Sequence, residues 1–168
     1  TVTGSAAVWL SKSGQGPKIK NVTFGKITDL GVKDANNMGA AMAPAAYDSL
    51  KQHMEDTGID YDLIVTGDLG TIGKSIVNKM FNEDGKSIEN KYDDCGTIIY
   101  DIEKQDVHAG GSGCGCSATV LGAFLYKKLL NNEINKLLFT STGALHSPTA
   151  TLQGESIPGI AHCIGIEM

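Results

Sequence analysis

The sequence predicts an α/β protein with a mixed five-stranded sheet and helices on both faces. Short apolar runs such as Tyr61–Thr66 and Leu137–Thr140 end at glycine or polar residues, which is typical of buried strands. Between the runs, apolar residues recur three and four positions apart, which is typical of helices. The glycine-rich run Gly110–Cys116 precedes Ser117–Leu130, where apolar side chains fall on nearly every helical face. Such a segment predicts a buried helix.

The remaining elements follow in chain order. A helix begins near Pro44, whose missing N–H is harmless in a first turn, and ends before Gly58. A second helix covers residues 75–81, and residues 82–94 form a polar loop. Strands are predicted at residues 2–11, 19–28, 61–66, 97–100, 137–140 and 160–167.

Composition limits the possible functions. The chain has 168 residues, a net charge of −5 and scattered basic residues, so we expect one ordinary domain and no nucleic-acid-binding face. No apolar run approaches the ~20 residues that span a bilayer. The cysteines lie in apolar or glycine-rich surroundings, which favours buried thiols in a reducing interior. The abrupt start at Thr1 indicates a fragment of a longer protein.

We expect three loops to meet at the edge of the sheet that the carboxyl ends of the strands form. Open α/β sheets bind their ligands beyond this edge. These loops are Thr66–Gly70, the neighbourhood of Cys95, and Gly110–Cys116. The last one would present backbone N–H groups at the start of a helix, which favours an anion.

Two nucleotide-binding patterns fail at defined positions. The run Val65–Ser75 resembles a P-loop, but Asp68 stands where the pattern needs glycine, and a carboxylate would repel phosphate oxygens. Gly113–Ala118 matches a dinucleotide fingerprint, but Glu133 precedes the next strand instead of closing one. We therefore expect neither nucleotide hydrolysis nor NAD binding.

The other candidate groups allow two interpretations each. Asp93 and Asp94 are either solvated or positioned to bind a cation or accept a ligand proton, because the next residues enter the core. His108 lies near the expected pocket, and this position is compatible with contact to a ligand and equally compatible with a structural role. The cysteines and histidines lack the spacing of a zinc site. Cys114, at a helix start, is a weak candidate nucleophile.

Several blocks of the sequence resemble the stage V sporulation protein AD family. The blocks run from one end of the chain to the other, at Thr1–Ser5, Met38–Ala46, Asp60–Leu69, Asp93–Gly96, Ala109–Cys114, Thr142–Leu145 and Ile157–His162. Family proteins are about twice as long, so the resemblance implies a C-terminal half, with residues 1–12 as the last strand of the missing N-terminal half. Tyr92 stands where the resemblance implies a histidine.

The resemblance also implies a thiolase-like fold, in which one helix from each half forms a central layer. It implies a non-catalytic subunit that binds dipicolinic acid, as its calcium chelate, during uptake in sporulation and release in germination. The expected partners are the other SpoVA membrane subunits, the missing N-terminal half and a possible homodimer. The expected location is inside a spore-forming cell, on the periphery of the spore inner membrane. No cofactor and no intrinsic metal are expected.

The candidate ligand-binding residues follow from the glycine-rich loop and the neighbouring acids. The loop would hold one carboxylate of the ligand, and the acids would face the chelated calcium. The predicted set is Asp68, Asp93, Asp94, His108, Gly111, Ser112, Gly113 and Cys114.

Catalysis is not expected, because the motifs of related enzymes are missing. Ketoacyl synthases of this fold need a His and an Asn from this half, and thiolases need a His-Pro after Gly-Gly. Neither Thr66–Leu69 nor Gly110–Cys116 contains them. Without a base and an oxyanion-hole donor, condensation lacks its main rate contributions. A residual acyl-CoA-dependent enzyme and a structural adaptor of the membrane complex remain the alternatives.

Overall fold

The computed structural model describes residues 1–168 and contains one mixed five-stranded sheet, in the order β1-β5-β4-β2-β3. Strand β2 is parallel to β3 and β4, whereas β5 is antiparallel to both β4 and β1. The strands are β1 (Lys18–Phe24), β2 (Leu63–Thr66), β3 (Tyr92–Asp94), β4 (Lys136–Ala144) and β5 (Gly159–Glu167). The predicted α/β class and the mixed five-stranded sheet are confirmed.

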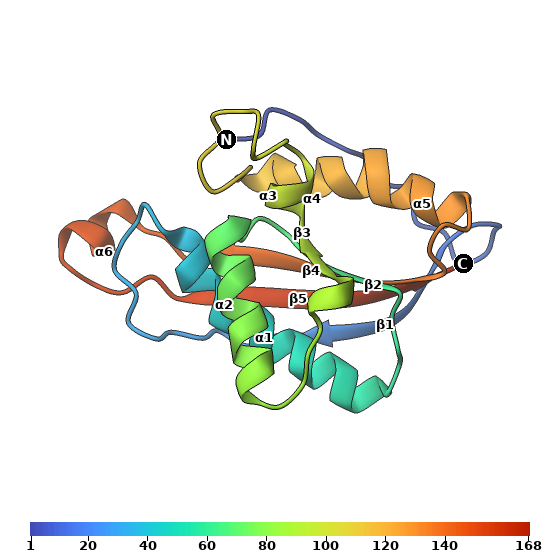
Figure 1. Cartoon of the computed structure of the whole chain (residues 1–168), viewed down its shortest axis with the longest axis horizontal. Helices are drawn as coiled ribbons and strands as arrows, with labels where there is room; N and C mark the ends of the chain where they lie inside the picture. Colours follow the sequence, from blue (N-terminus) through green and yellow to red (C-terminus); the bar gives the residue numbers. More distant parts are fainter.

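Helices cover both faces of the sheet (Figure 1). Helices α1 (Met38–Thr57) and α2 (Gly70–Glu83) pack on one face, where Leu50, Phe81 and Leu138 belong to a common core. The opposite face carries α4 (Cys114–Val120) and α5 (Tyr126–Leu130), joined by the π-helical stretch η2 (Leu121–Leu125). The short elements are η1 (Glu89–Lys91), α3 (Cys95–Ile98) and α6 (Pro148–Leu152). None of the helices is both long and apolar enough to cross a membrane.

Helix α1 begins six residues earlier than predicted. Asn37 caps it by accepting a hydrogen bond from the amide of Ala40, a stronger start signal than Pro44. Pro44 therefore lies inside the helix, where it removes one backbone donor. The predicted end is confirmed, because Gly58 adopts a left-handed φ of 63° and its amide bonds back to Met54.

The predicted strand at residues 97–100 is wrong. Asp94 caps α3 by accepting a hydrogen bond from the amide of Gly96, and the hydroxyl oxygen of Thr97 lies 2.8 Å from the carbonyl oxygen of Asp94. These contacts outweigh the β-propensity of Thr97 and its two isoleucine neighbours. The edge strand is β3, inside the segment predicted as a polar loop.

Residues 1–11 form no strand within this chain, and their predicted place as a strand of the missing N-terminal half stays a prediction. They run alongside α4 and α5 instead (Figure 1). The amide of Val2 donates to the carbonyl of Ser112, and Gly4 approaches Thr119 so closely that a β-carbon would overlap its hydroxyl. This segment has no strand partner within the chain, so its small residues serve close packing against a helix.

The other differences concern element ends. Helix α2 begins five residues before the predicted 75, because the left-handed Gly70 turns the chain directly from β2 into the helix. Strand β1 ends at Phe24, four residues before the predicted end at residue 28. Beyond Phe24 the pairing continues only as an isolated bridge between Thr28 and Gly159. Helix α6 lies in a predicted loop, with Ser147 as its cap and Pro148 in its first turn.

Candidate functional site

The predicted convergence of three loops is confirmed by direct hydrogen bonds. The amide of Gly111 donates to the carbonyl of Gly96 at 2.7 Å, which joins the glycine-rich loop to α3. The amide of Gly113 donates to Oδ2 of Asp68 at 2.9 Å, which joins the same loop to the end of β2. The carboxyl ends of β2, β3 and β4 therefore meet in one group of loops, which we name the loop cluster (Thr66–Gly70, Asp93–Thr97, Gly110–Cys116 and Thr142).

Asp94 is the fully buried centre of the loop cluster. Its Oδ2 accepts hydrogen bonds from the Thr66 hydroxyl at 2.7 Å and the Leu69 amide at 2.9 Å. Its Oδ1 accepts from the amides of Gly70 and Gly96, both at 2.9 Å. Burial raises the pKa of the Asp94 carboxyl, and these four hydrogen bonds oppose the rise. Every strong acceptor direction is in use, so Asp94 holds the loops together and has no direction left for a ligand.

Tyr92 extends this buried network. Its hydroxyl lies 2.9 Å from Oγ1 of Thr66, which in turn donates to Asp94. Since Thr66 uses its own hydrogen on Asp94, the Tyr92 hydroxyl is the donor to Thr66. Burial raises the pKa of Tyr92 well above its ordinary value. The side chain that stands where a histidine was expected is therefore a structural, neutral phenol.

Asp93 faces the outer side of the cluster and forms an ion pair. Its Oδ1 accepts from Lys74 Nζ at 2.8 Å, from the Thr97 hydroxyl at 2.7 Å and from the Asp94 amide at 2.7 Å. Burial acts to raise the pKa of Asp93, but the bonds from Lys74, Thr97 and the Asp94 amide outweigh it, so the pKa lies below its ordinary value. This carboxylate stays ionised and already has a cation.

Asp68 is half-buried and lies directly against the glycine-rich loop. Besides accepting from Gly113, it accepts from the Thr142 hydroxyl through Oδ1 at 3.0 Å, and its own amide donates to Thr142 Oγ1 at 3.2 Å. The carboxylate thus occupies part of the anion seat that the sequence predicted at Gly111–Cys114. A negative group at this helix start is favourable, because it meets the positive end of the helix dipole.

The backbone amides of the glycine-rich loop are only partly used. Gly111 and Gly113 donate within the chain, whereas the amides of Ser112 and Cys114 have no acceptor in it. Gly113 adopts a φ of 100°, which favours glycine, and Gly111 leaves no room for a β-carbon beside Val2. The loop conformation therefore depends on its glycines, and two of its N–H groups remain for another partner.

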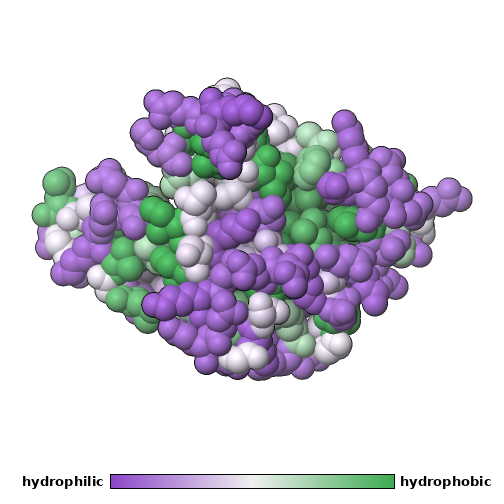
Figure 2. All heavy atoms as spheres, viewed as in Figure 1, coloured by the Kyte–Doolittle hydropathy of each residue, from purple (hydrophilic) through white to green (hydrophobic).

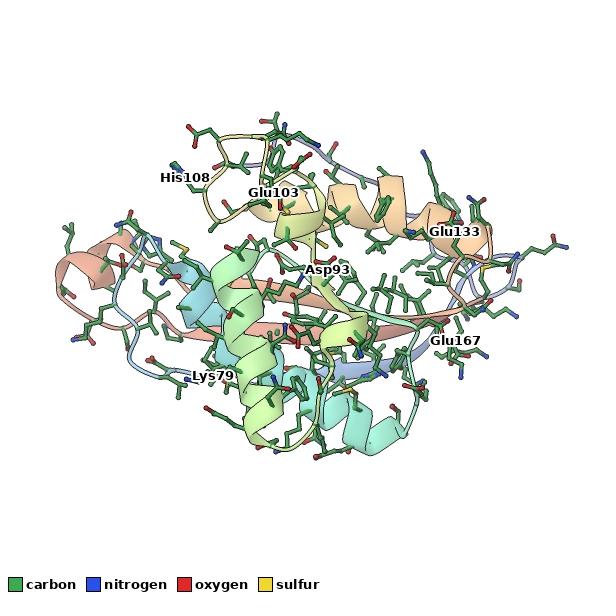
Figure 3. The ribbon with its side chains drawn as sticks, viewed as in Figure 1. Lys79, Asp93, Glu103, His108, Glu133 and Glu167 are labelled. Atoms are coloured by element: carbon green, nitrogen blue, oxygen red, sulfur yellow. The ribbon has the colours of Figure 1, made fainter.

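His108 and Cys114 differ in position from the other predicted residues. The His108 side chain is 91% exposed and lies 3.3 Å from Asp106. Figure 3 shows it on the outer side of its loop, away from Asp93. The structure does not bring His108 into the loop cluster. The Cys114 thiol is exposed at the start of α4, whereas burial raises the pKa of Cys95 and Cys116 and keeps them as thiols.

Sequence reasoning assigned no role to three polar residues of the cluster, namely Thr66, Lys74 and Thr142. Thr66 and Thr142 lie at or near the carboxyl ends of β2 and β4, so the rule that pointed to Asp68 could have included them. Lys74 lies one turn into α2 and gave no such signal, because a lysine on a helix is ordinarily a solvated group.

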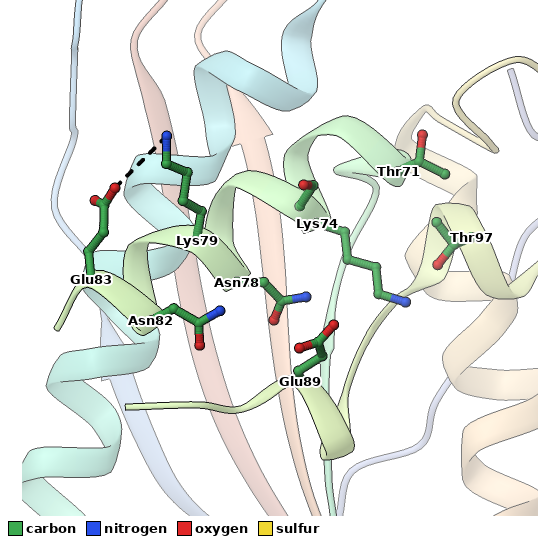
Figure 4. A pocket seen from close by; sticks show the side chains of 9 residues that line it. Thr71, Lys74, Asn78, Lys79, Asn82, Glu83, Glu89 and Thr97 are labelled. Carbon is green, nitrogen blue, oxygen red and sulfur yellow. Dashed lines mark ion pairs between the residues drawn. The ribbon is translucent and has the colours of Figure 1, made fainter. Parts of the chain in front are cut away.

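A polar groove lies beside the cluster. This groove of about 770 Å³ runs between α2, η1 and α3 (Figure 4). Thr71, Lys74, Asn78 and Thr97 are among its lining residues, and no hydrophobic side chain lines it. The unpaired amides of Ser112 and Cys114 belong to the loop cluster and do not line this groove, so we place the candidate site at the loop cluster. No group of three His, Cys, Asp or Glu side chains in the chain is arranged to hold a metal ion.

Fold and site together define an α/β protein whose polar side chains and glycine-rich backbone gather at the carboxyl ends of its parallel strands. The family model of stage V sporulation protein AD (SpoVAD) matches residues 1–167. The chain is also 48% identical over 170 residues to stage V sporulation protein AD of Bacillus subtilis (strain 168). The chain belongs to the stage V sporulation protein AD family, a family of sporulation proteins. The aligned region covers 99% of this chain and 50% of the relative, so the chain spans about half of the relative's length.

Proposed function

We propose that this chain supplies half of a non-catalytic, thiolase-like subunit that binds dipicolinic acid as its calcium chelate. In this proposal the subunit acts with the SpoVA membrane subunits, at the periphery of the spore inner membrane, in dipicolinate uptake and release. The observation that carries the proposal is the pairing of Asp68 with the glycine-rich loop, in a chain of the sporulation family. A carboxylate and unpaired amides, side by side, suit a ligand that carries both calcium and carboxylate groups.

The unpaired amides of Ser112 and Cys114 would donate to one ligand carboxylate. Asp68 would supply a hard oxygen to the chelated calcium, which prefers six to eight oxygen ligands. Calcium enters here as part of the ligand. Asp93 and Asp94 take supporting roles, since Lys74 neutralises one and four hydrogen bonds saturate the other.

Calorimetry on the full-length protein tests the proposal. Dipicolinate is titrated with and without calcium into the wild type, Asp68→Asn and the control Asp106→Asn, whose side chain is 93% exposed. We expect binding that strengthens with calcium, a loss of at least about tenfold in Asp68→Asn, and no change in the control. Absence of binding in both conditions would overturn the proposal.

Binding in place of catalysis is part of the proposal and has its own test. The full-length protein is incubated with acyl-CoAs, and each cysteine is examined by mass spectrometry for a thioester. Released CoA, or an acyl group on the exposed Cys114, would favour a residual acyl-CoA enzyme. Unmodified cysteines together with dipicolinate binding would support a binding protein.

We further propose that the rest of the full-length protein packs on the outer side of α4 and α5. Phe124, Tyr126 and Leu130 are 40–46% exposed there, although the sequence predicted a helix buried all round. Figure 2 shows apolar atoms reaching the surface beneath these helices. The adjoining N-terminal segment adds an exposed Trp9. The relative is about twice as long as this chain, so we propose that the other half of the full-length protein packs on this apolar surface of α4 and α5.

Light scattering of the isolated chain and tryptophan fluorescence of the full-length protein test this cover. The isolated chain should self-associate through its bare face, whereas the full-length protein should bury Trp9 and show a blue-shifted tryptophan emission. A monomeric isolated chain at high concentration would contradict the proposed interface.

A further inference from the structure

The second half of β1 is an open sheet edge that lacks the usual protection. β1 is the first strand in the order β1-β5-β4-β2-β3, so one side of it has no strand partner. Lysine side chains and β-bulges normally keep such an edge from pairing with another chain. Both devices lie at the start of β1, as Lys18, Lys20 and the register shift between Ile19 and Asn21. From Asn21 to Phe24 the register with β5 is regular and the strand carries no charge.

The opposite edge of the sheet is not open in this way. β3 has three residues, and α3 follows it directly. Asp93 of β3 pairs with Lys74 of α2, and Asp94 is held by four hydrogen bonds in the loop cluster. A strand of this length, fixed at its end, offers little backbone to a further strand, so β1 is the edge that can take one.

The side chains of β1 determine what each face of an added strand would meet. Thr23 points to the α1 side, where its Oγ1 lies 2.8 Å from Nδ1 of His53. Val22 and Phe24 point to the other face, because successive side chains of a strand alternate. They are 49% and 84% exposed, although Phe24 packs edge-on against His162. An added strand would therefore cover apolar surface with every second side chain.

The α1 side of the same edge is a groove with acidic walls. The groove has a volume of about 450 Å³ and lies between the end of β1 and α1, which run alongside each other (Figure 1). Asp48, Gln52 and Asp56 line it from one side of α1, since they are four residues apart. Lys26 pairs with Asp48 at 2.9 Å, whereas Asp56 accepts from Gln52 at 2.8 Å and has no cationic partner. Side chains of an added strand on this face would meet an excess of negative charge, which favours lysine or arginine.

We propose that the end of β1 binds an extended segment of a partner protein, which joins the sheet as a further strand and alternates basic with apolar side chains. Main-chain hydrogen bonds along the edge would supply affinity, and the alternating side chains would supply specificity. The basic side chains face Asp48 and Asp56, and the apolar ones cover Val22 and Phe24. The loop cluster lies at the ends of β2, β3 and β4, so this inference does not rest on dipicolinate binding.

A second copy of this chain fits the edge less well. Its own open segment, Asn21–Gly25, carries no charged side chain. Pairing of two such segments would cover Val22 and Phe24 but leave Asp56 without a cation. The charge of the groove therefore favours a different protein.

Peptide binding to the full-length protein, measured by fluorescence anisotropy, tests the proposal. The probe is a capped, labelled peptide of alternating lysine and valine, and the reference peptide alternates threonine and valine. The lysine peptide should bind the wild type about tenfold more tightly, because each of the two carboxylates contributes about threefold. Asp48→Asn combined with Asp56→Asn should remove this preference. The control Asp106→Asn, whose side chain is 93% exposed elsewhere on the surface, should keep it.

N-methylated versions of the lysine peptide test the strand pairing itself. Successive amides of a strand point to opposite edges, so methylation of every second amide gives two sets of peptides. One set should bind at least about tenfold more weakly, and the other should bind as the parent does. Hydrogen–deuterium exchange of residues 19–27 should slow in the complex, while exchange of β3 stays unchanged. These changes are made in the peptide, so the folding of the protein is not affected.

Three results would overturn the proposal. They are absence of binding by the lysine peptide, equal behaviour of the two methylated sets, and a preference for lysine that survives in the double asparagine variant. Protection of residues 19–27 that rises with the concentration of the full-length protein alone would assign the edge to a second copy, and would equally contradict a foreign strand.

Discussion

Removal of the Asp94 carboxylate should loosen the two segments that it joins, Thr66–Gly70 and the start of α3. In Asp94→Ala, the buried amides of Leu69, Gly70 and Gly96 lose their acceptor. Each buried donor left unsatisfied costs about 1–3 kcal/mol, and relief of the buried charge offsets part of the sum. We therefore expect a net loss of about 4 kcal/mol in the local stability of the loop cluster.

Asp94→Asn should cost about half as much. The new carboxamide oxygen can still accept from Gly70 and Gly96, and its nitrogen then faces Thr66 and Leu69. Thr66 can accept from that nitrogen and turn its own hydrogen to the Asp93 carbonyl, 3.5 Å away. Only the Leu69 amide remains without an acceptor, so the expected loss is about 2 kcal/mol.

Hydrogen–deuterium exchange of the full-length protein measures this loss locally. At 1.4 kcal/mol for each factor of ten, protection in peptides covering residues 66–71 and 95–98 should fall about 700-fold in Asp94→Ala and about 30-fold in Asp94→Asn. Asp106→Asn serves as the exposed control and should stay within about 0.5 kcal/mol of the wild type. Equal protection in Asp94→Ala and the control would refute the central role of this carboxylate.

Two further predictions concern the contacts around α2. The lowered pKa of Asp93 means that the Asp93–Lys74 pair contributes stability above the ordinary carboxyl pKa and loses it as the pH falls through the lower folded value. Lys74→Met should flatten the acid limb of a thermal-stability profile below about pH 4, and an unchanged limb would contradict this. In Gly73→Ala the new methyl group would lie 2.7 Å from the Gly39 carbonyl oxygen, so the free energy of unfolding should fall by about 1–3 kcal/mol in a thermal melt. The control Ser75→Ala, at an exposed position of the same helix, should leave the free energy of unfolding unchanged.

The sequence allowed prediction of those elements that bury a continuous apolar run. Strands β4 and β5 and the end of α1 lie where the apolar pattern and Gly58 indicated. The errors occur where local hydrogen bonds oppose propensity. Asp94 converts a β-branched run into α3, and Asn37 starts α1 before Pro44. Both caps were visible as residue types, but their bonding partners depend on the fold.

The convergence of the loops was predictable, whereas the separate roles of the three acids were not. Asp93 and Asp94 look equivalent in the sequence. In the structure Asp93 accepts a hydrogen bond from Lys74, whereas Asp94 accepts four hydrogen bonds from buried donors. Strand geometry decides this difference, because successive side chains of β3 point to opposite faces of the sheet. Their neighbouring positions in the sequence could not show that Asp93 forms an ion pair whereas Asp94 is buried and caps α3.

The charge of the loop cluster bears directly on which form of a dicarboxylate it would accept. Asp68, Asp93 and Asp94 contribute three carboxylates, and Lys74 is the one cation hydrogen-bonded to any of them. A free dianion beside Asp68 would meet net repulsion, since two like charges at close range disfavour each other strongly outside bulk water. A chelated divalent cation changes the sign of that interaction, because Asp68 then meets the metal while the Ser112 and Cys114 amides meet a carboxylate. Asp68→Asn removes the repulsion and the metal ligand together, so it should weaken calcium-dependent binding while it relieves the penalty on the free dianion. A calcium dependence that survives Asp68→Asn unchanged would place the ligand elsewhere.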